Sequence, residues 1–126
     1  MKRKVFITTV PFADVNKFPL EMLESNQIDY RINSLGRKLT EAEMKEKVGD
    51  AEVIIAGTEP ITAKVLAHAK KLKHISRVGV GLDSVDLLEA GRRGISVSYT
   101  PDAPAPAVAE LTMGLMFCLL RKIHIS

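Results

Sequence analysis

The chain has no tryptophan and a single cysteine among its 126 residues, and aromatic residues make up only 5% of it. A sequence so poor in aromatic side chains is not expected to form a base-stacking platform for nucleic acid. One cysteine, Cys118, excludes a disulfide within the chain and fits a reducing compartment. Because Cys118 lies in an apolar helical run, we expect an inert, buried thiol and not a nucleophile.

Strong charge and long apolar runs are scarce as well. The 18 basic and 15 acidic residues are spread along the chain and leave a net charge of +3. Basic pairs such as Lys70-Lys71 are therefore expected on solvated helix faces and not in a nucleic-acid site. The most apolar stretch, 111–120, is about half of the roughly 20 residues that a membrane span requires. We expect a cytoplasmic protein of one domain, with no membrane or nucleic-acid partner.

What the chain does contain is a regular alternation of β-forming runs and helical segments. Strands are predicted at residues 5–9, 28–32, 53–56, 74–78 and 95–99, and helices from about 16 or 19 to 25 and at 41–48, 62–69 and 84–90. This alternation predicts an α/β fold, a parallel sheet of five strands with helices on both faces. Charged residues alternate with apolar ones in the second strand, which favours an edge position. Thr40 and Glu43 form a capping box before the second helix.

The most informative stretch runs from Arg77 to Asp86, after the fourth predicted strand. Gly79 and Gly81 flank Val80 there, and because they have no Cβ both can take positive φ and let a ligand approach the backbone. Free N–H groups at a strand-to-helix turn favour an anion such as a carboxylate or a phosphate. Asp83 is predicted to cap the following helix and to stabilise it by about 1 kcal/mol. A turn that serves only packing is the alternative.

The last part of the chain differs in composition. Residues 100–106 hold three of the six prolines, which predicts an extended, stiff connector. The helix predicted from 107 to about 123 is apolar on nearly every side, so we expect it to be buried all round. Because the predicted sheet is already covered by helices, this last helix cannot pack on it. We therefore expect another domain or another chain to bury the helix. We predict a homodimer through residues 107–123, built on Leu111, Leu115, Met116 and Leu119.

Two blocks of sequence carry a resemblance to a known family. The first is RVGVGLDSVD at residues 77–86, and the second joins Gly94-Ile95, Thr100-Pro101 and the run VAELT at 108–112. Their order and spacing resemble the D-isomer-specific 2-hydroxyacid dehydrogenases, the family of D-3-phosphoglycerate dehydrogenase. The resemblance implies a flavodoxin-like substrate-binding lobe over residues 1–100. It also implies a connector and crossover helix over 101–126, leading toward a Rossmann lobe that binds NAD.

In this family a 2-hydroxy acid gives hydride to the nicotinamide while a histidine takes the hydroxyl proton. The resemblance assigns the substrate carboxylate to the backbone amides of Val78, Gly79, Val80 and Gly81. Thr58 is either a second substrate contact or part of a plain loop. The residues expected to face the cofactor are Val80, Thr100 and Thr112.

The sequence also departs from the family pattern. The dinucleotide fingerprint and the catalytic arginine, glutamate and histidine have no match within the 126 residues. We assign His68, His74 and His124 to surface or packing roles. The chain is therefore expected to be inactive alone and to bind no cofactor itself, NAD belonging to the complete enzyme. The alternative is a non-catalytic module that binds a small carboxylate or associates through its last helix.

Overall fold

The structure is a computed structural model that describes residues 4–125, without the side chain of His124. Its strands are β1 (Lys4–Ile7), β2 (Asp29–Ile32), β3 (Val53–Ala56), β4 (His74–Arg77) and β5 (Ser96–Ser98). Its helices are α1 (Phe18–Ser25), α2 (Glu41–Lys47), α3 (Ala63–His68), α4 (Leu87–Arg92), α5 (Ala105–Arg121) and the short 3₁₀ helix η1 (Ile123–Ile125). The strands form one parallel sheet in the order β2-β1-β3-β4-β5. This confirms the predicted α/β fold with a five-stranded sheet, and β2 lies at an edge as predicted.

The hydrophobic core lies between the sheet and the layer formed by α2, α3 and α4. Phe6, Ile54 and Ile75 are register partners on three neighbouring strands, so their side chains leave the same face of the sheet. They pack with residues of the covering helices such as Met44 and Leu66, and all five side chains are almost fully buried. Each buried side chain of this size contributes roughly 1.5–3 kcal/mol. The sequence forms this layer because its strands are short, apolar and separated by helices.

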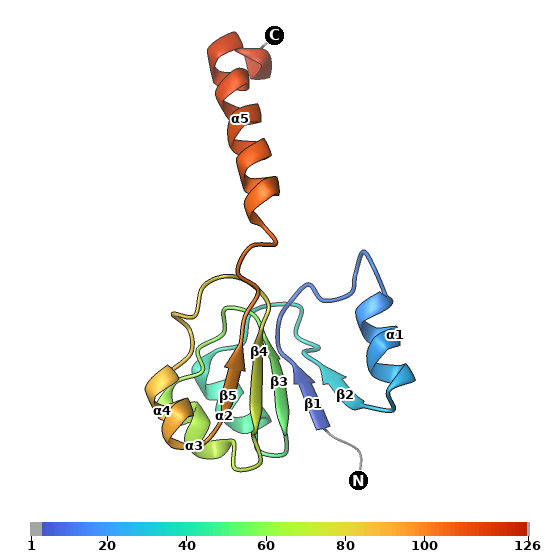
Figure 1. Cartoon of the computed structure of the whole chain (residues 1–126), viewed down its shortest axis with the longest axis vertical. Coiled ribbons are helices and arrows are strands. Elements are labelled where there is room, and N and C mark those ends of the chain that lie inside the picture. The colour runs from blue at the N-terminus through green and yellow to red at the C-terminus, as the bar shows by residue number, and fades with distance from the viewer. Residues whose placement is uncertain (1–3, 126) are drawn as a thin grey trace.

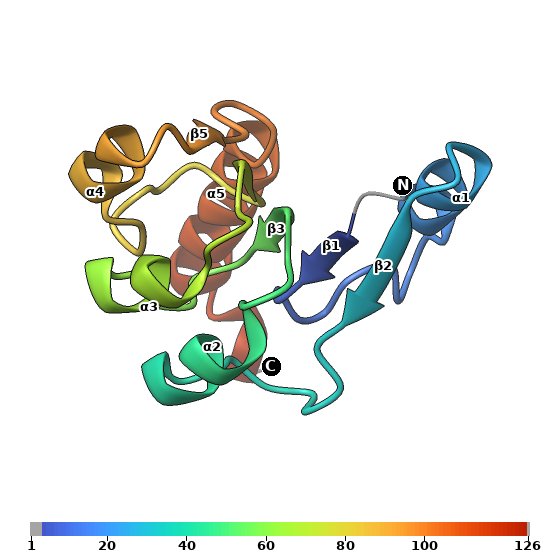
Figure 2. The same cartoon turned by 90° about the horizontal axis from the view of Figure 1, so that it is seen from below.

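The opposite face of the sheet is covered only near β2. Helix α1 packs against β2 there, on the other side of the sheet from α2, α3 and α4 (Figure 2). Further along, His74, Ser96 and Ser98 lie on the uncovered part of this face. The two ring nitrogens of His74 lie 2.7 Å from the Ser96 hydroxyl and 3.0 Å from the Ser98 hydroxyl. Helices therefore lie on both faces, but the cover on the second face is partial.

Local capping signals agree with the prediction at α2 and differ at α4. Thr40 and Glu43 form the predicted capping box at α2. At α4 the predicted cap, Asp83, is wrong: the cap is Asp86, whose carboxylate accepts from the backbone N–H of Glu89 at 2.9 Å. The reason is a contact distant in sequence, because Ile61 forms a β-bridge with Val85 and holds this backbone out of the helix.

Helix α5 stands away from the rest of the fold, rising from the connector above the sheet (Figure 1). Within residues 4–125, η1 is the one other element that it packs against. Leu111, Leu115 and Leu119 are 63%, 55% and 69% exposed. Cys118 is half-buried, so this structure buries the thiol less than the sequence predicts. Whether another domain or chain covers α5 remains a prediction. In the described part of the chain, no helix has the length and apolar character needed to cross a membrane.

Candidate functional site

The candidate site lies at the carboxyl ends of the parallel strands, the edge where open α/β sheets bind ligands. Backbone hydrogen bonds join the turn after β4 to the segments on both sides of it. Val78 donates its backbone N–H to Ala56 at the end of β3 at 2.8 Å, and Gly79 accepts from the backbone N–H of Thr100 at 3.0 Å. The turn is thus held against the end of β3 on one side and the segment after β5 on the other.

Gly79 is the position in this turn that requires glycine. Its φ is +134°, and a Cβ placed on it would lie 2.7 Å from a terminal guanidinium nitrogen of Arg77. A side chain at this position would therefore be strained by the backbone and would displace Arg77. Gly79 uses the positive φ that glycine permits, whereas Gly81 does not, and an added Cβ at Gly81 would make only ordinary contact with Asp83.

Three backbone amides of the turn are available to a ligand. Within the described residues, the N–H groups of Gly79, Val80 and Gly81 donate to no acceptor. The N–H of Val78 is not available, because it already donates to the carbonyl of Ala56. Unbonded amides at one turn form a positive concavity that suits an anion. Of the four amides predicted to hold a carboxylate, three are therefore available. That a carboxylate binds there stays a prediction.

A buried carboxylate that the sequence analysis missed fixes the neighbouring loop. Glu59 is 2% exposed, and its carboxylate accepts from the Thr8 hydroxyl at 3.1 Å and from the Gly57 N–H at 2.8 Å. These bonds join the end of β1 to the loop after β3, and they leave Thr58 exposed on that loop. The sequence signal was a glutamate three residues beyond the end of a buried strand.

Arg77 is the second residue that the sequence analysis passed over. It is 8% exposed, its Nε has no hydrogen-bond partner, and one terminal nitrogen donates to the carbonyl of Val78. Within residues 4–125, no carboxylate oxygen lies within 4.0 Å of it. The hydroxyl of Ser84 is also buried without a partner.

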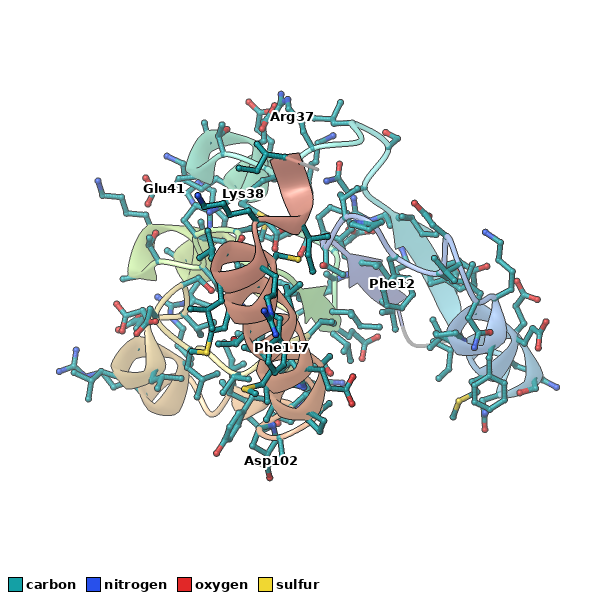
Figure 3. The ribbon with its side chains drawn as sticks, turned by 90° about the horizontal axis from the view of Figure 1, so that it is seen from above. Phe12, Arg37, Lys38, Glu41, Asp102 and Phe117 are labelled. Carbon is teal, nitrogen blue, oxygen red and sulfur yellow. The ribbon has the colours of Figure 1, made fainter. Side chains whose placement is uncertain are left out.

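These two groups line a hollow of about 450 Å³ beside the turn. Lys38, Thr58, Thr62 and Asp83 complete most of its wall. Figure 3 views from above the edge over which α5 stands. Arranged around this edge are Lys38 in the loop before α2, Glu41 at the start of α2, Phe12 in the loop after β1 and Asp102 in the connector. The hollow combines two basic side chains, several hydroxyls and one lining carboxylate.

The other predicted site residues are placed as follows. Thr100 is exposed and adjoins the turn through its bond to Gly79. Thr112 is not brought to the turn: it lies on α5, where its hydroxyl donates to the Val108 carbonyl at 2.7 Å. His68 is exposed on α3 and close to the Lys64 carbonyl. The side chain of His124 lies outside the described part of the structure. Among the residues described, no group of three His, Cys, Asp or Glu side chains could hold a metal ion.

An open parallel sheet with unbonded backbone amides in a turn at its carboxyl edge is typical of the general class of α/β ligand-binding lobes. Residues 5–116 match the model of the D-isomer specific 2-hydroxyacid dehydrogenase family, catalytic domain. The chain belongs to this family.

Individual relatives agree with this assignment. The chain is 47% identical over 87 residues to D-3-phosphoglycerate dehydrogenase of Methanocaldococcus jannaschii, which covers 68% of this chain and 16% of that protein. It is 32% identical over 125 residues to glyoxylate reductase of Pyrococcus furiosus, covering 98% of this chain and 35% of the relative. An NAD⁺-bound 3-phosphoglycerate dehydrogenase from Entamoeba histolytica matches with a TM-score of 0.81 at 27% identity, over 94% of this chain and 39% of that one. The chain thus spans well under half of these proteins.

Proposed function

We propose that this chain supplies the substrate-binding part of an NAD-dependent oxidoreductase that acts on a small 2-hydroxy or 2-oxo acid. The observation that carries the proposal is the turn after β4, where three adjacent amides lack acceptors within the described residues. The positive φ of Gly79 shapes this turn. The family assignment supports the same interpretation.

In this proposal the amides of Gly79, Val80 and Gly81 hold the substrate carboxylate. Glu59 keeps the loop with Thr58 in place beside them, and this leaves Thr58 free to contact the substrate. Neither residue transfers a proton; both position groups around the carboxylate.

The cofactor would meet this chain at the same edge. Val80 is 48% exposed, and Thr100 is exposed and adjoins the turn, so these residues fit one wall of a nicotinamide site. Thr112 does not fit that role in the present arrangement, because it lies on the separate helix α5. NAD, when bound, would supply the hydride chemistry. Since no catalytic histidine adjoins the turn within the described residues, we propose that this chain alone is inactive.

The carboxylate site can be tested by mapping backbone amide shifts in the isolated chain. D-glycerate and glyoxylate should shift Gly79, Val80 and Gly81, with weak affinity because one chain offers one wall of a cleft. Gly79→Val should abolish the shifts, since a β-branched residue resists positive φ and blocks approach. Gly91→Val is the matched control, because an added Cβ at Gly91 meets nothing within 4 Å. Shifts confined to residues far from the turn would refute the site.

A second proposal, a non-catalytic association module, rests on the exposed apolar surface of α5. A second copy that pairs through residues 107–123 would bury Leu111, Leu115 and Leu119, and burial at about 25 cal/mol per Å² favours this pairing. Sedimentation at low micromolar concentration should show a dimer, and Leu115→Glu should return it to a monomer. A monomer whose mass and stability do not change with Leu115→Glu would exclude this pairing. We also propose a cytoplasmic location, consistent with the single cysteine.

A further inference from the structure

Glu59 is a buried anion at the sheet edge where another anion is proposed to bind. Its side chain is 2% exposed, and in the part of the chain that the structure describes no basic side chain lies within 4.0 Å of its carboxylate. A buried charge is costly unless hydrogen bonds or a counter-charge hold it. The charge of Glu59 also repels a carboxylate bound at the same edge. Its hydrogen bonds, and not its charge alone, must therefore explain what it does there.

The carboxylate of Glu59 is bonded to a peptide group that also holds the turn after β4. Glu59 accepts from the backbone N–H of Gly57 at 2.8 Å, and this N–H belongs to the peptide between Ala56 and Gly57. The carbonyl of the same peptide accepts from the N–H of Val78 at 2.8 Å. Glu59 is thus connected to the first residue of the turn through a single peptide group.

The charge of Glu59 strengthens both hydrogen bonds of this peptide. A hydrogen bond to an ionised acceptor is roughly twice as strong as a neutral one. Bonds that share a peptide polarise each other, so a charged acceptor at the N–H makes the carbonyl a better acceptor for Val78. From Val78 the backbone continues directly into the turn amides of residues 79–81, which lack acceptors within the described residues. The direction of these amides therefore depends on the bond at Val78.

The packing around Gly57 fits the same carboxylate. A Cβ added at Gly57 would lie 3.0 Å and 3.1 Å from the two carboxylate oxygens of Glu59, and 2.8 Å from the Thr9 hydroxyl. Gly57 is not among the described residues with positive φ, so its backbone conformation does not require glycine. The missing side chain instead lets the carboxylate approach the peptide closely.

We propose that Glu59 is a positioning residue for the carboxylate-binding turn, acting through the Ala56–Gly57 peptide on Val78 and so on the three amides that follow. The inference rests on the proposed function for the occupant of the turn. It also fixes the sign of a substitution's effect. If Glu59 acted only through its charge, Glu59→Gln would relieve a repulsion and strengthen the binding of a carboxylate. Because Glu59 positions the turn, the same substitution weakens binding.

The test measures two quantities by NMR in the isolated chain at neutral pH. One is the affinity for D-glycerate, taken from the shifts of the turn amides. The other is the scalar coupling across the hydrogen bond from Val78 to Ala56, recorded without ligand. Glu59→Gln should weaken binding about two- to fivefold, because a charge-assisted bond becomes a neutral one. The coupling should fall with it.

Thr8→Val is the matched control, because it acts on the same carboxylate oxygen. It removes the hydrogen bond from the Thr8 hydroxyl at 3.1 Å and leaves the bond from the Gly57 N–H in place. This variant should be less stable in urea but should keep both the affinity and the coupling. Gly57→Ala serves if Glu59→Gln does not fold: it keeps the charge of Glu59 and displaces its carboxylate, so it should lower both quantities.

The outcomes separate this inference from the proposed function. Unchanged or tighter binding of D-glycerate by Glu59→Gln would overturn the inference. Equal losses in Glu59→Gln and Thr8→Val would reduce the effect to lost stability and overturn it as well. If D-glycerate does not shift the turn of the unsubstituted chain, the carboxylate site fails. The ligand-free coupling then decides the role of Glu59: a smaller coupling in Glu59→Gln supports it, and a constant one refutes it.

Discussion

The sheet lobe over residues 4–100 and the helix α5 are both rich in apolar residues, yet they differ completely in burial. In the lobe, Ile54 and Ile75 are 0% exposed, whereas Leu115 on α5 is 55% exposed. The lobe brings apolar faces together through its own crossovers, whereas within the described residues α5 has only the short helix η1 packed against it. An apolar pattern in the sequence therefore shows that a surface will be buried, and topology decides whether the same chain can bury it.

The largest expected effect tests this comparison directly. Ile75→Ala should lower the free energy of unfolding by about 2–5 kcal/mol, because it removes a core side chain and leaves a cavity. Leu115→Ala removes a similar volume from an exposed position and should change it by about 0.5 kcal/mol or less in the monomer. Urea unfolding followed by circular dichroism at low protein concentration measures both. Losses of equal size would show that α5 packs on the lobe in solution.

A smaller loss of stability is expected within the lobe, where two aspartates near the start of α4 can be compared. Asp86→Ala should cost about 1 kcal/mol, because it leaves the Glu89 N–H without its acceptor. Asp83→Ala should cost about 0.5 kcal/mol or less, since its exposed carboxylate caps no helix. The same unfolding experiment compares the two, and a larger loss for Asp83→Ala would contradict the observed cap.

The sequence predicts those features of the lobe that depend on neighbouring residues. The parallel five-stranded sheet follows from the alternation of strands and helices, and the capping box at Thr40 follows from spacing alone. The burial of Glu59 and Arg77 was not predictable in this way. A single charged residue at or just beyond the end of a strand is exposed in most proteins, and only contacts distant in sequence, such as the one between Thr8 and Glu59, show that these two are buried. The cap at Asp86 was missed for a similar reason, because it depends on Ile61, which is distant in sequence.

The smallest expected effect concerns the cap at the start of α2, which α5 lacks. Helix α5 has no side-chain cap, whereas Glu43 in α2 accepts from the Thr40 N–H at 2.8 Å and pairs with Arg37 at 2.6 Å. The hydrogen bond from Arg37, followed by the one from the Thr40 backbone, lowers the pKa of Glu43 from 4.5 to about 2.

Because this folded-state pKa is depressed, the ionised Glu43 stabilises α2 fully above pH 4.5, and the contribution is lost as the pH falls toward about 2. Arg37→Ala should raise the pKa of Glu43 without restoring it fully to 4.5, because the bond from the Thr40 N–H remains. Its loss of stability in acid should then begin at a higher pH. A carboxyl carbon titration followed by NMR measures the pKa in both proteins. An identical midpoint in the two would show that Arg37, at an exposed position, contributes nothing to the cap in water.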